Sequence, residues 1–192
     1  MSQVLLAKTR SMIPTPKEIE ELAAQHPQTS PNACTSWGVE MLFRIHGKEL
    51  PQHYQETHPN GCGFGEEVRA ALRAGLGFPV IDPTFGDDFG KFERNVLASI
   101  RMGFFPIFIF PSYFHFDRTD EKMVLAHHTF VTYEEAGSLK FVTRGFRDGG
   151  PMHYTMNQFE KMRYSWTPYV SKLGCEEDLL LHTLLPESIQ LE

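Results

Sequence analysis

The chain has little of what marks several large classes of protein. Its 192 residues include only three cysteines, Cys34, Cys62 and Cys175, and their number and spacing do not suit a disulfide framework. No apolar run approaches the length of a membrane-spanning helix, and the first residues carry only a short apolar patch at 4–7. We therefore expect a cytoplasmic protein with reduced thiols and no membrane span. A chain exported by a route without a cleaved signal would look the same.

Positive charge is also scarce. Lysine and arginine total 18 against 24 aspartates and glutamates, a formal net charge of -6, and no dense basic run is present to track phosphates. The sequence therefore predicts no nucleic-acid partner. What the chain does contain is typical of a globular protein, with 41% hydrophobic residues and 16 phenylalanines that predict an aromatic core. The length suits a single domain over 1–192, because no repeat or linker divides it.

The order of the predicted elements indicates an α+β fold. Helical periodicity recurs over 17–25, 34–46, 66–74 and 89–101. The period then changes at the apolar run Phe104–Phe110, and alternation over 127–134 and 139–144 predicts a hairpin that turns at 135–138. A capping-box pattern at Thr155 and Gln158 predicts a short closing helix that ends near Arg163. Helices first and sheet second favour α+β over alternating α/β.

The candidate nucleophile is Cys34. It opens the helix predicted over 34–46, which is apolar on nearly all sides and is therefore expected to be central and buried. Free backbone N–H groups at a helix start favour the thiolate, which is the nucleophilic form of cysteine. The simpler interpretation is a small core residue, because most cysteines at the head of an apolar helix are that.

Two further signals accompany this cysteine. Gln28 precedes it by six residues, close enough for the side-chain amide to join the Cys34 N–H as a donor to an oxyanion, although a loop glutamine is usually just solvated. His127 and His128 begin an alternating strand, so one imidazole is expected to face the core and the other to point away. Only one of them can be a catalytic base, and periodicity does not decide which.

Glutamine, helix-opening cysteine and strand histidine in this order resemble the papain-like cysteine peptidase superfamily. Within it, the chain is similar to the double-glycine leader peptidases that process bacteriocins. The segment CTSWGVEMLFRIHG resembles the family's nucleophile helix, FERNVLASIRMGFFPIFIFP its helix-then-strand segment, HTFV from His128 its histidine strand, and 156–166 its closing element. The resemblance covers about 25–170. It implies a papain-like fold, with N-terminal helices and a buried nucleophile helix packed on a C-terminal antiparallel sheet.

The resemblance also implies roles. Cys34 would be the nucleophile, a histidine of the 127/128 pair the base, and Gln28 with the Cys34 N–H the oxyanion hole. We prefer His128 as the base, because it begins the family-like histidine run. The implied reaction is that of a cysteine peptidase or amidohydrolase, which acts on an amide of a peptide or protein substrate through a Cys34 thioester. Deamidase and transglutaminase-type transfer stay open, and neither cofactor nor metal is implied.

The sequence departs from the family at the residue that orients the base. Residue sums near 272 in the hairpin place Arg144 opposite His128, where the family has aspartate or asparagine. We expect Asp148 to take that role from the glycine-rich loop 145–150, or a neutral group such as Thr143 to do so. Trp37 also follows the nucleophile closely, where the family has a small residue. These departures favour an alternative, a catalytically silent binding or regulatory protein on the same scaffold.

A rival constellation consists of His53, His58 and Cys62, whose side chains suit zinc. Their spacing is not a standard one, and a fourth ligand would have to come from His115 or Cys175. We therefore expect no metal at this loop.

Overall fold

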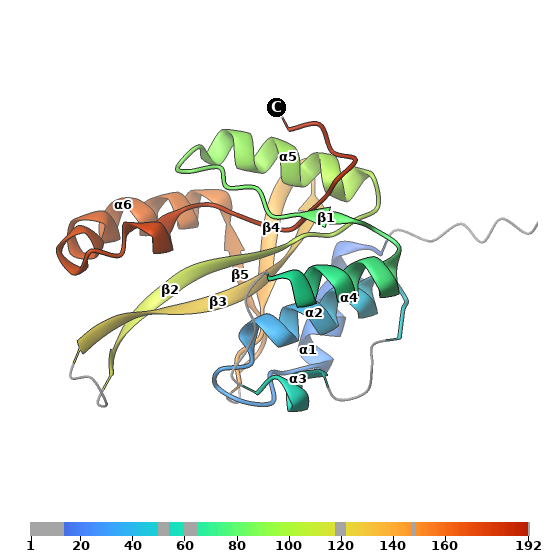
Figure 1. Cartoon of the computed structure of the whole chain (residues 1–192), viewed down its shortest axis with the longest axis horizontal. Helices are drawn as coiled ribbons and strands as arrows, with labels where there is room; N and C mark the ends of the chain where they lie inside the picture. Colours follow the sequence, from blue (N-terminus) through green and yellow to red (C-terminus); the bar gives the residue numbers. More distant parts are fainter. Residues whose placement is uncertain (1–13, 50–53, 60–64, 118–121, 147–148, 192) are drawn as a thin grey trace, which may run out of the picture.

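The computed structural model of the protein describes residues 14–49, 54–59, 65–117, 122–146 and 149–191, in a mixed helical and sheet structure (Figure 1). The described strands form a four-stranded antiparallel sheet in the order β2-β3-β4-β5 and a separate antiparallel pair, β1-β6. The predicted α+β class is confirmed. Across the described residues, no helix is both long enough and apolar enough to cross a bilayer.

The helices precede and follow the main sheet. Their bounds are α1 Pro16–Gln25, α2 Cys34–Ile45, α3 Tyr54–Thr57, α4 Glu66–Leu76, α5 Phe89–Arg101, α6 Met156–Leu173 and the 3-10 turn η1 Glu176–Leu179. The strands are β1 Val80–Ile81, β2 Ile107–Asp117, β3 Lys122–Glu135, β4 Ser138–Thr143, β5 Met152–Thr155 and β6 Leu185–Pro186.

The hairpin between β3 and β4 turns where the sequence predicts. Glu135 pairs with Ser138, and the two residues between them have positive φ, 50° at Ala136 and 78° at Gly137, as a type I′ turn requires. The predicted register is wrong by one residue, because Val131 pairs with Val142. Arg144 therefore does not lie opposite His128.

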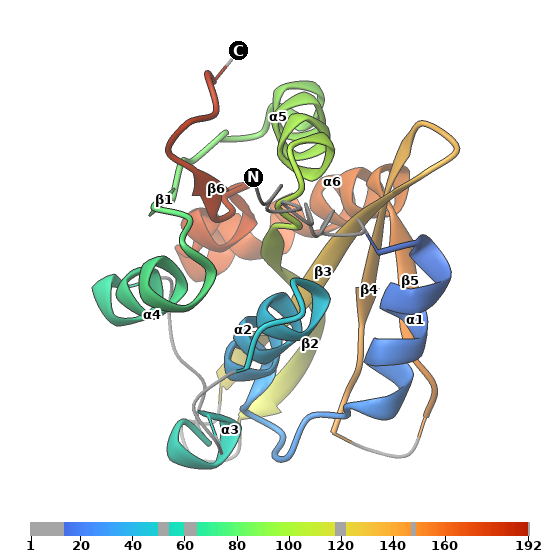
Figure 2. The same cartoon turned by 90° about the vertical axis from the view of Figure 1, so that its right-hand side faces the viewer.

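Alternation along β3 divides the residues of the sheet between two faces. On one face Tyr133 donates a hydrogen bond to Glu20 of α1 at 2.9 Å. On the other, the ring of Phe130 packs against Phe159 of α6, with centroids 4.9 Å apart. Figure 1 shows α5 and α6 on one side of β2 and β3, and α1 and α2 on the other. Figure 2 shows α2 against β2 and β3, while α1 lies beside β3 and β4.

The face beneath α5 and α6 holds the aromatic core that the composition predicts. Its phenylalanine rings are stacked, tilted or edge-to-face at centroid distances of 4.7 to 6.5 Å, and all are fully buried. They are Phe92, Phe108, Phe110, Phe130, Phe141 and Phe159.

The opposite face is covered by α2, which is buried as its periodicity predicts. Gly38 makes the close approach of this helix to the sheet possible. A Cβ atom at this position would lie 2.3 Å from Cγ2 of Thr129 and 3.5 Å from Cδ1 of Ile107. Glycine is therefore the residue that lets the α2 backbone contact β3 directly.

Two predicted helix ends are wrong, because tertiary packing overrides the local signals. Helix α4 continues past Gly75, where a Cβ atom would lie 2.1 Å from the Phe43 ring, so this glycine serves close packing rather than termination. Helix α6 runs on from Arg163 through Pro168 and ends at Gly174, in the left-handed conformation. The fully buried Val170 anchors the added turns.

Candidate functional site

The direction of α2 along the sheet decides what Cys34 faces. At the C-terminal end of α2, Nε2 of His46 lies 3.1 Å from the carbonyl oxygen of Gly103, in the turn that precedes β2. The middle of the helix contacts the sheet through Gly38, at Thr129. Cys34 lies one turn before Gly38 on the same helical face. It therefore lies towards the part of β3 that precedes Thr129.

His127 belongs to the face of β3 that α2 covers. Side chains two residues apart on a strand point the same way, so His127 shares its face with Thr129. Gly38 packs on that threonine, and Cys34 lies beyond Gly38 in the direction of His127. The fold thus brings His127 and Cys34 to the same side of the sheet.

His128 lies on the opposite face. Its ring meets Phe130 edge-on at 6.4 Å, and Nδ1 lies 2.8 Å from the Ser112 hydroxyl, just past the β2 residue with which it pairs. Burial lowers the pKa of His128 below its ordinary value, and the neighbouring His127 lowers it further. This placement of the pair favours His127 over His128 as the partner of Cys34.

Cys34 is partly exposed at the start of α2, and its Sγ lies 3.8 Å from the Thr35 hydroxyl. The residue that caps α2 is Ala33, whose side chain makes no capping hydrogen bond. The first N–H groups of the helix are thus not used by an N-cap side chain, as they are in α1, where Thr15 accepts from Glu18. The N–H groups at the start of α2 can therefore donate hydrogen bonds to an anion.

Gln28 lies buried in the loop before α2, with 4% of its surface exposed. Its Nε2 has no hydrogen-bond partner among the described residues. A buried amide donor without a partner is uncommon, since leaving one unsatisfied costs about 1–3 kcal/mol. The loop is tied down around it: the Trp37 indole donates to the carbonyl of His26 at 2.6 Å, and Thr29 N donates to Gln55 Oε1 at 3.0 Å.

Asp148, the carboxylate that the sequence predicts to orient the base, lies outside the described residues. Thr143 is fully buried and its hydroxyl has no described partner. Alternation in β4 puts it on the face of Phe141, which is the side of His128. Arg144 follows β4 with its Nε and one Nη nitrogen buried and without a described partner.

Of the five side chains considered for a metal site, only those of His58 and Cys175 are described. His58 stacks on Tyr54 at 4.3 Å, and its Nδ1 lies 3.0 Å from the Tyr54 carbonyl. His53, Cys62 and the His115 side chain lie outside the described part, while Cys175 packs against the core after α6. Within the described ranges, no three potential ligands come together.

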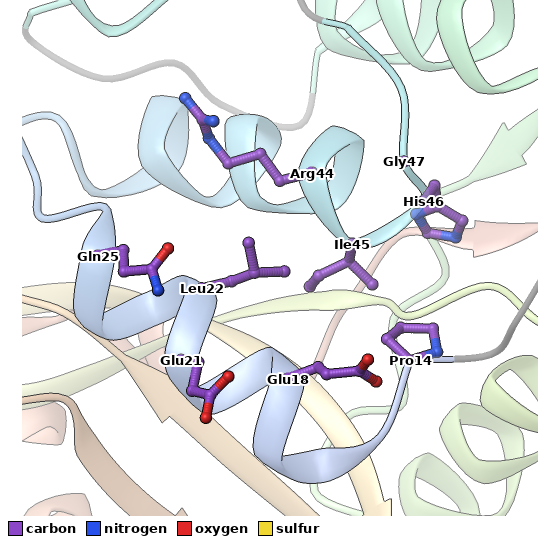
Figure 3. Close-up of a pocket in the computed structure, with 9 residues that line it drawn as sticks. All are labelled: Pro14, Glu18, Glu21, Leu22, Gln25, Arg44, Ile45, His46 and Gly47. Atoms are coloured by element: carbon purple, nitrogen blue, oxygen red, sulfur yellow. The ribbon is translucent and has the colours of Figure 1, made fainter.

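A groove of about 470 Å³ lies between α1 and the C-terminal half of α2. Its polar side chains diverge: Figure 3 shows Arg44 pointing away from α1, Glu21 away from α2, and Glu18 towards Pro14. Glu18 is occupied in capping α1, because it accepts from Thr15 N at 2.6 Å. The groove is at the opposite end of α2 from Cys34 and does not form part of the candidate site.

Family models, curated proteins and solved structures were each compared with the chain, and none matches it. The interpretation of the site therefore depends on its geometry. That geometry includes three polar residues which sequence reasoning missed: Glu40 and Gln55 beside the loop of Gln28, and Ser112 beside His128. No local pattern marks them, because their partners are distant in sequence.

Proposed function

We propose that this protein is a cysteine-dependent enzyme of papain-like fold that acts on an amide bond of a peptide or protein, as a cysteine peptidase or amidohydrolase. Cys34 is the nucleophile and His127 the base. One observation carries the proposal: the helix that Cys34 opens packs, through Gly38, on the face of β3 that holds His127. The motif order glutamine, cysteine, histidine supports it independently.

The proposed reaction begins with transfer of the Cys34 thiol proton to His127. The thiolate attacks the amide carbonyl carbon, and the resulting oxyanion accepts hydrogen bonds from Gln28 Nε2 and the Cys34 N–H. The imidazolium then protonates the leaving amine, the C–N bond breaks and a thioester remains. Water attacks the thioester with His127 as base, which releases a carboxylic acid and restores the thiol. An amine in place of water would give acyl transfer.

The unpartnered amide of Gln28 supports its role as oxyanion donor. In the resting site this buried N–H group has no described acceptor, and an oxyanion formed above Cys34 would supply one. A donor held ready in this way stabilises the charge of the transition state more than the ground-state amide.

A second candidate is a catalytically silent binding protein on the same scaffold. Arg144 favours it, because two of its buried guanidinium nitrogens have no described partner and could donate hydrogen bonds to a bound ligand, without any role in catalysis. Such a protein would hold a peptide without forming a thioester.

The two candidates separate on covalent chemistry. We expect brief iodoacetamide treatment near pH 7, followed by peptide mapping, to label Cys34 faster than Cys62 or Cys175. Peptide-amide substrates should give turnover that Cys34→Ala abolishes and Cys175→Ala leaves unchanged. Preferential labelling of Cys175, or turnover that survives Cys34→Ala, would contradict the enzyme proposal.

A further inference from the structure

Gln55 of α3 connects α2 to the loop that carries Gln28. Its backbone N–H donates to Glu40 Oε1 at 3.0 Å, and its side-chain Nε2 donates to Glu40 Oε2 at 2.8 Å. Its Oε1 accepts from the Thr29 N–H at 3.0 Å and from the Thr29 hydroxyl at 3.4 Å. Gln55 is 4% exposed, so these bonds form away from bulk water.

This arrangement requires an amide at position 55. Glu40 presents two acceptor oxygens, while Thr29 presents two donors, so the side chain between them must donate on one side and accept on the other. A glutamate would face Glu40 with a second carboxylate, and an apolar residue would leave Glu40 Oε2 and both Thr29 donors without their partner.

The same short segment, 54–59, holds the surroundings of the nucleophile at two more points. The Ser30 hydroxyl donates to the carbonyl of Pro59, and the Ser36 hydroxyl donates to the carbonyl of His58. Ser30 lies in the loop after Gln28, and Ser36 in the first turn of α2. The segment therefore ties the loop after Gln28 to the first turn of α2.

The Nε2 donor of Gln28 has no hydrogen-bond partner among the described residues. The direction of the Gln28 amide therefore depends on side-chain packing and on the backbone of the next residue, Thr29. We propose that Gln55 and Glu40 are positioning residues for the oxyanion hole. Through Thr29 they hold Gln28 where its side-chain amide and the Cys34 N–H can donate to the same oxyanion. This inference rests on the proposed function.

The test exchanges the two polar groups. Gln55→Glu and Glu40→Gln each break the match between donors and acceptors, whereas the double variant restores it, with the amide on α2 and the carboxylate on α3. Loss of one oxyanion-hole donor costs about 10²–10³ in kcat, so a misaligned donor is expected to cost about tenfold or more. We expect KM to change little, because the donor acts in the transition state.

The double variant should recover kcat to within about threefold of the unchanged chain, since neighbouring partners couple strongly. The matched control is Gln158→Glu, the same chemical change at an exposed capping position of α6, where glutamate also completes a capping box. It should leave kcat unchanged. Hydrogen exchange at the Thr29 amide, followed in parallel, should be faster in Gln55→Glu and return to its original rate in the double variant.

Three results would overturn the inference: unchanged kcat in both single variants, equal loss in Gln158→Glu, or a folded double variant that stays as slow as the single ones. Failure of the proposed function looks different. In that case the unchanged chain shows no turnover dependent on Cys34, while Thr29 exchange still responds to the swap. Faster hydrogen exchange at Thr29 without any loss of kcat would show that Gln55 and Glu40 stabilise the loop but do not position the oxyanion hole.

Discussion

The two faces of β3 are built from alternate residues of the same strand, yet they differ in what they can do. Beneath α5 and α6 lie fully buried aromatic rings, and His128 is held among them by Ser112. Beneath α2 lie the close helix approach at Gly38, the buried Thr129 hydroxyl without a described partner, and the start of the cysteine helix. One face is filled by aromatic packing, and the other lies against the helix that Cys34 opens.

The face of a strand, rather than proximity in sequence, decides what a histidine side chain can contact. His127 and His128 are adjacent, and a motif match cannot separate them. Strand alternation separates them completely, because neighbouring side chains point to opposite sides of a sheet. Once the packing of Gly38 on Thr129 is known, the assignment of each histidine to a face follows.

The largest expected effect is on the packing face. Phe159 is fully buried, and its ring lies 4.7 Å from Phe141 and 4.9 Å from Phe130. We expect Phe159→Ala to lower the free energy of unfolding by about 3–5 kcal/mol, because it leaves a cavity in the aromatic core. Urea unfolding measures it. The control is Tyr164→Ala on the same helix, 86% exposed, which should change stability little.

The next largest effect is expected on the face of β3 that α2 covers. Gly38→Ala puts a methyl group against Thr129, and we expect it to destabilise the protein by about 1–3 kcal/mol through overpacking and to slow Cys34 alkylation by displacing α2. In α5, a Cβ at Gly90 meets its nearest side-chain atoms at 3.4 Å, so Gly90→Ala should be neutral or stabilising. Equal stability in the two variants would show that α2 does not need its close approach.

A change of pH is expected to have a smaller effect on the stability of the fold, through one histidine on each side of the sheet. Burial lowers the pKa of His128, and it lowers that of His46 although the carbonyls of Leu42 and Gly103 oppose the change. The unfolded chain thus binds more protons than the folded one below about pH 6.5, so stability is fully present above that pH and falls as the pH drops towards the lowered pKa values. Urea midpoints at pH 7.5 and 5.5 measure this, and His128→Asn should flatten the dependence. A midpoint that rises on acidification would contradict the sign.

Sequence reasoning predicted the elements whose signals are local. Residues 89–101 form a helix with the predicted bounds, because an amphipathic pattern lies between Asp88, which caps it, and Gly103. The buried α2 and the hairpin turn at Ala136 and Gly137 were predicted for the same reason. Extending α6 through Pro168 requires knowledge of the buried Val170, which no local pattern supplies.

The residues of the candidate site also differ in whether local sequence signals reveal them. Cys34 and Gln28 are visible in the sequence, because helix start and loop position are local properties. The choice between the histidines is not, since it requires the register of β3 and the element that covers each face. The one-residue error at Arg144 shows how sensitive such an argument is: a shift of one exchanges the two faces of a strand. Asp148 stays a prediction, because it lies outside the described residues.

We expect the two histidines to differ in their effect on Cys34. The rate of iodoacetamide labelling of Cys34 near neutral pH, read by peptide mapping, is measured in His127→Ala and in His128→Ala, together with turnover of a peptide-amide substrate. A general base contributes about 10²–10⁴-fold, so His127→Ala should lose turnover on that scale and label Cys34 more slowly, while folded His128→Ala keeps both within a few-fold. The reverse pattern, loss in His128→Ala with His127→Ala still active, would contradict it.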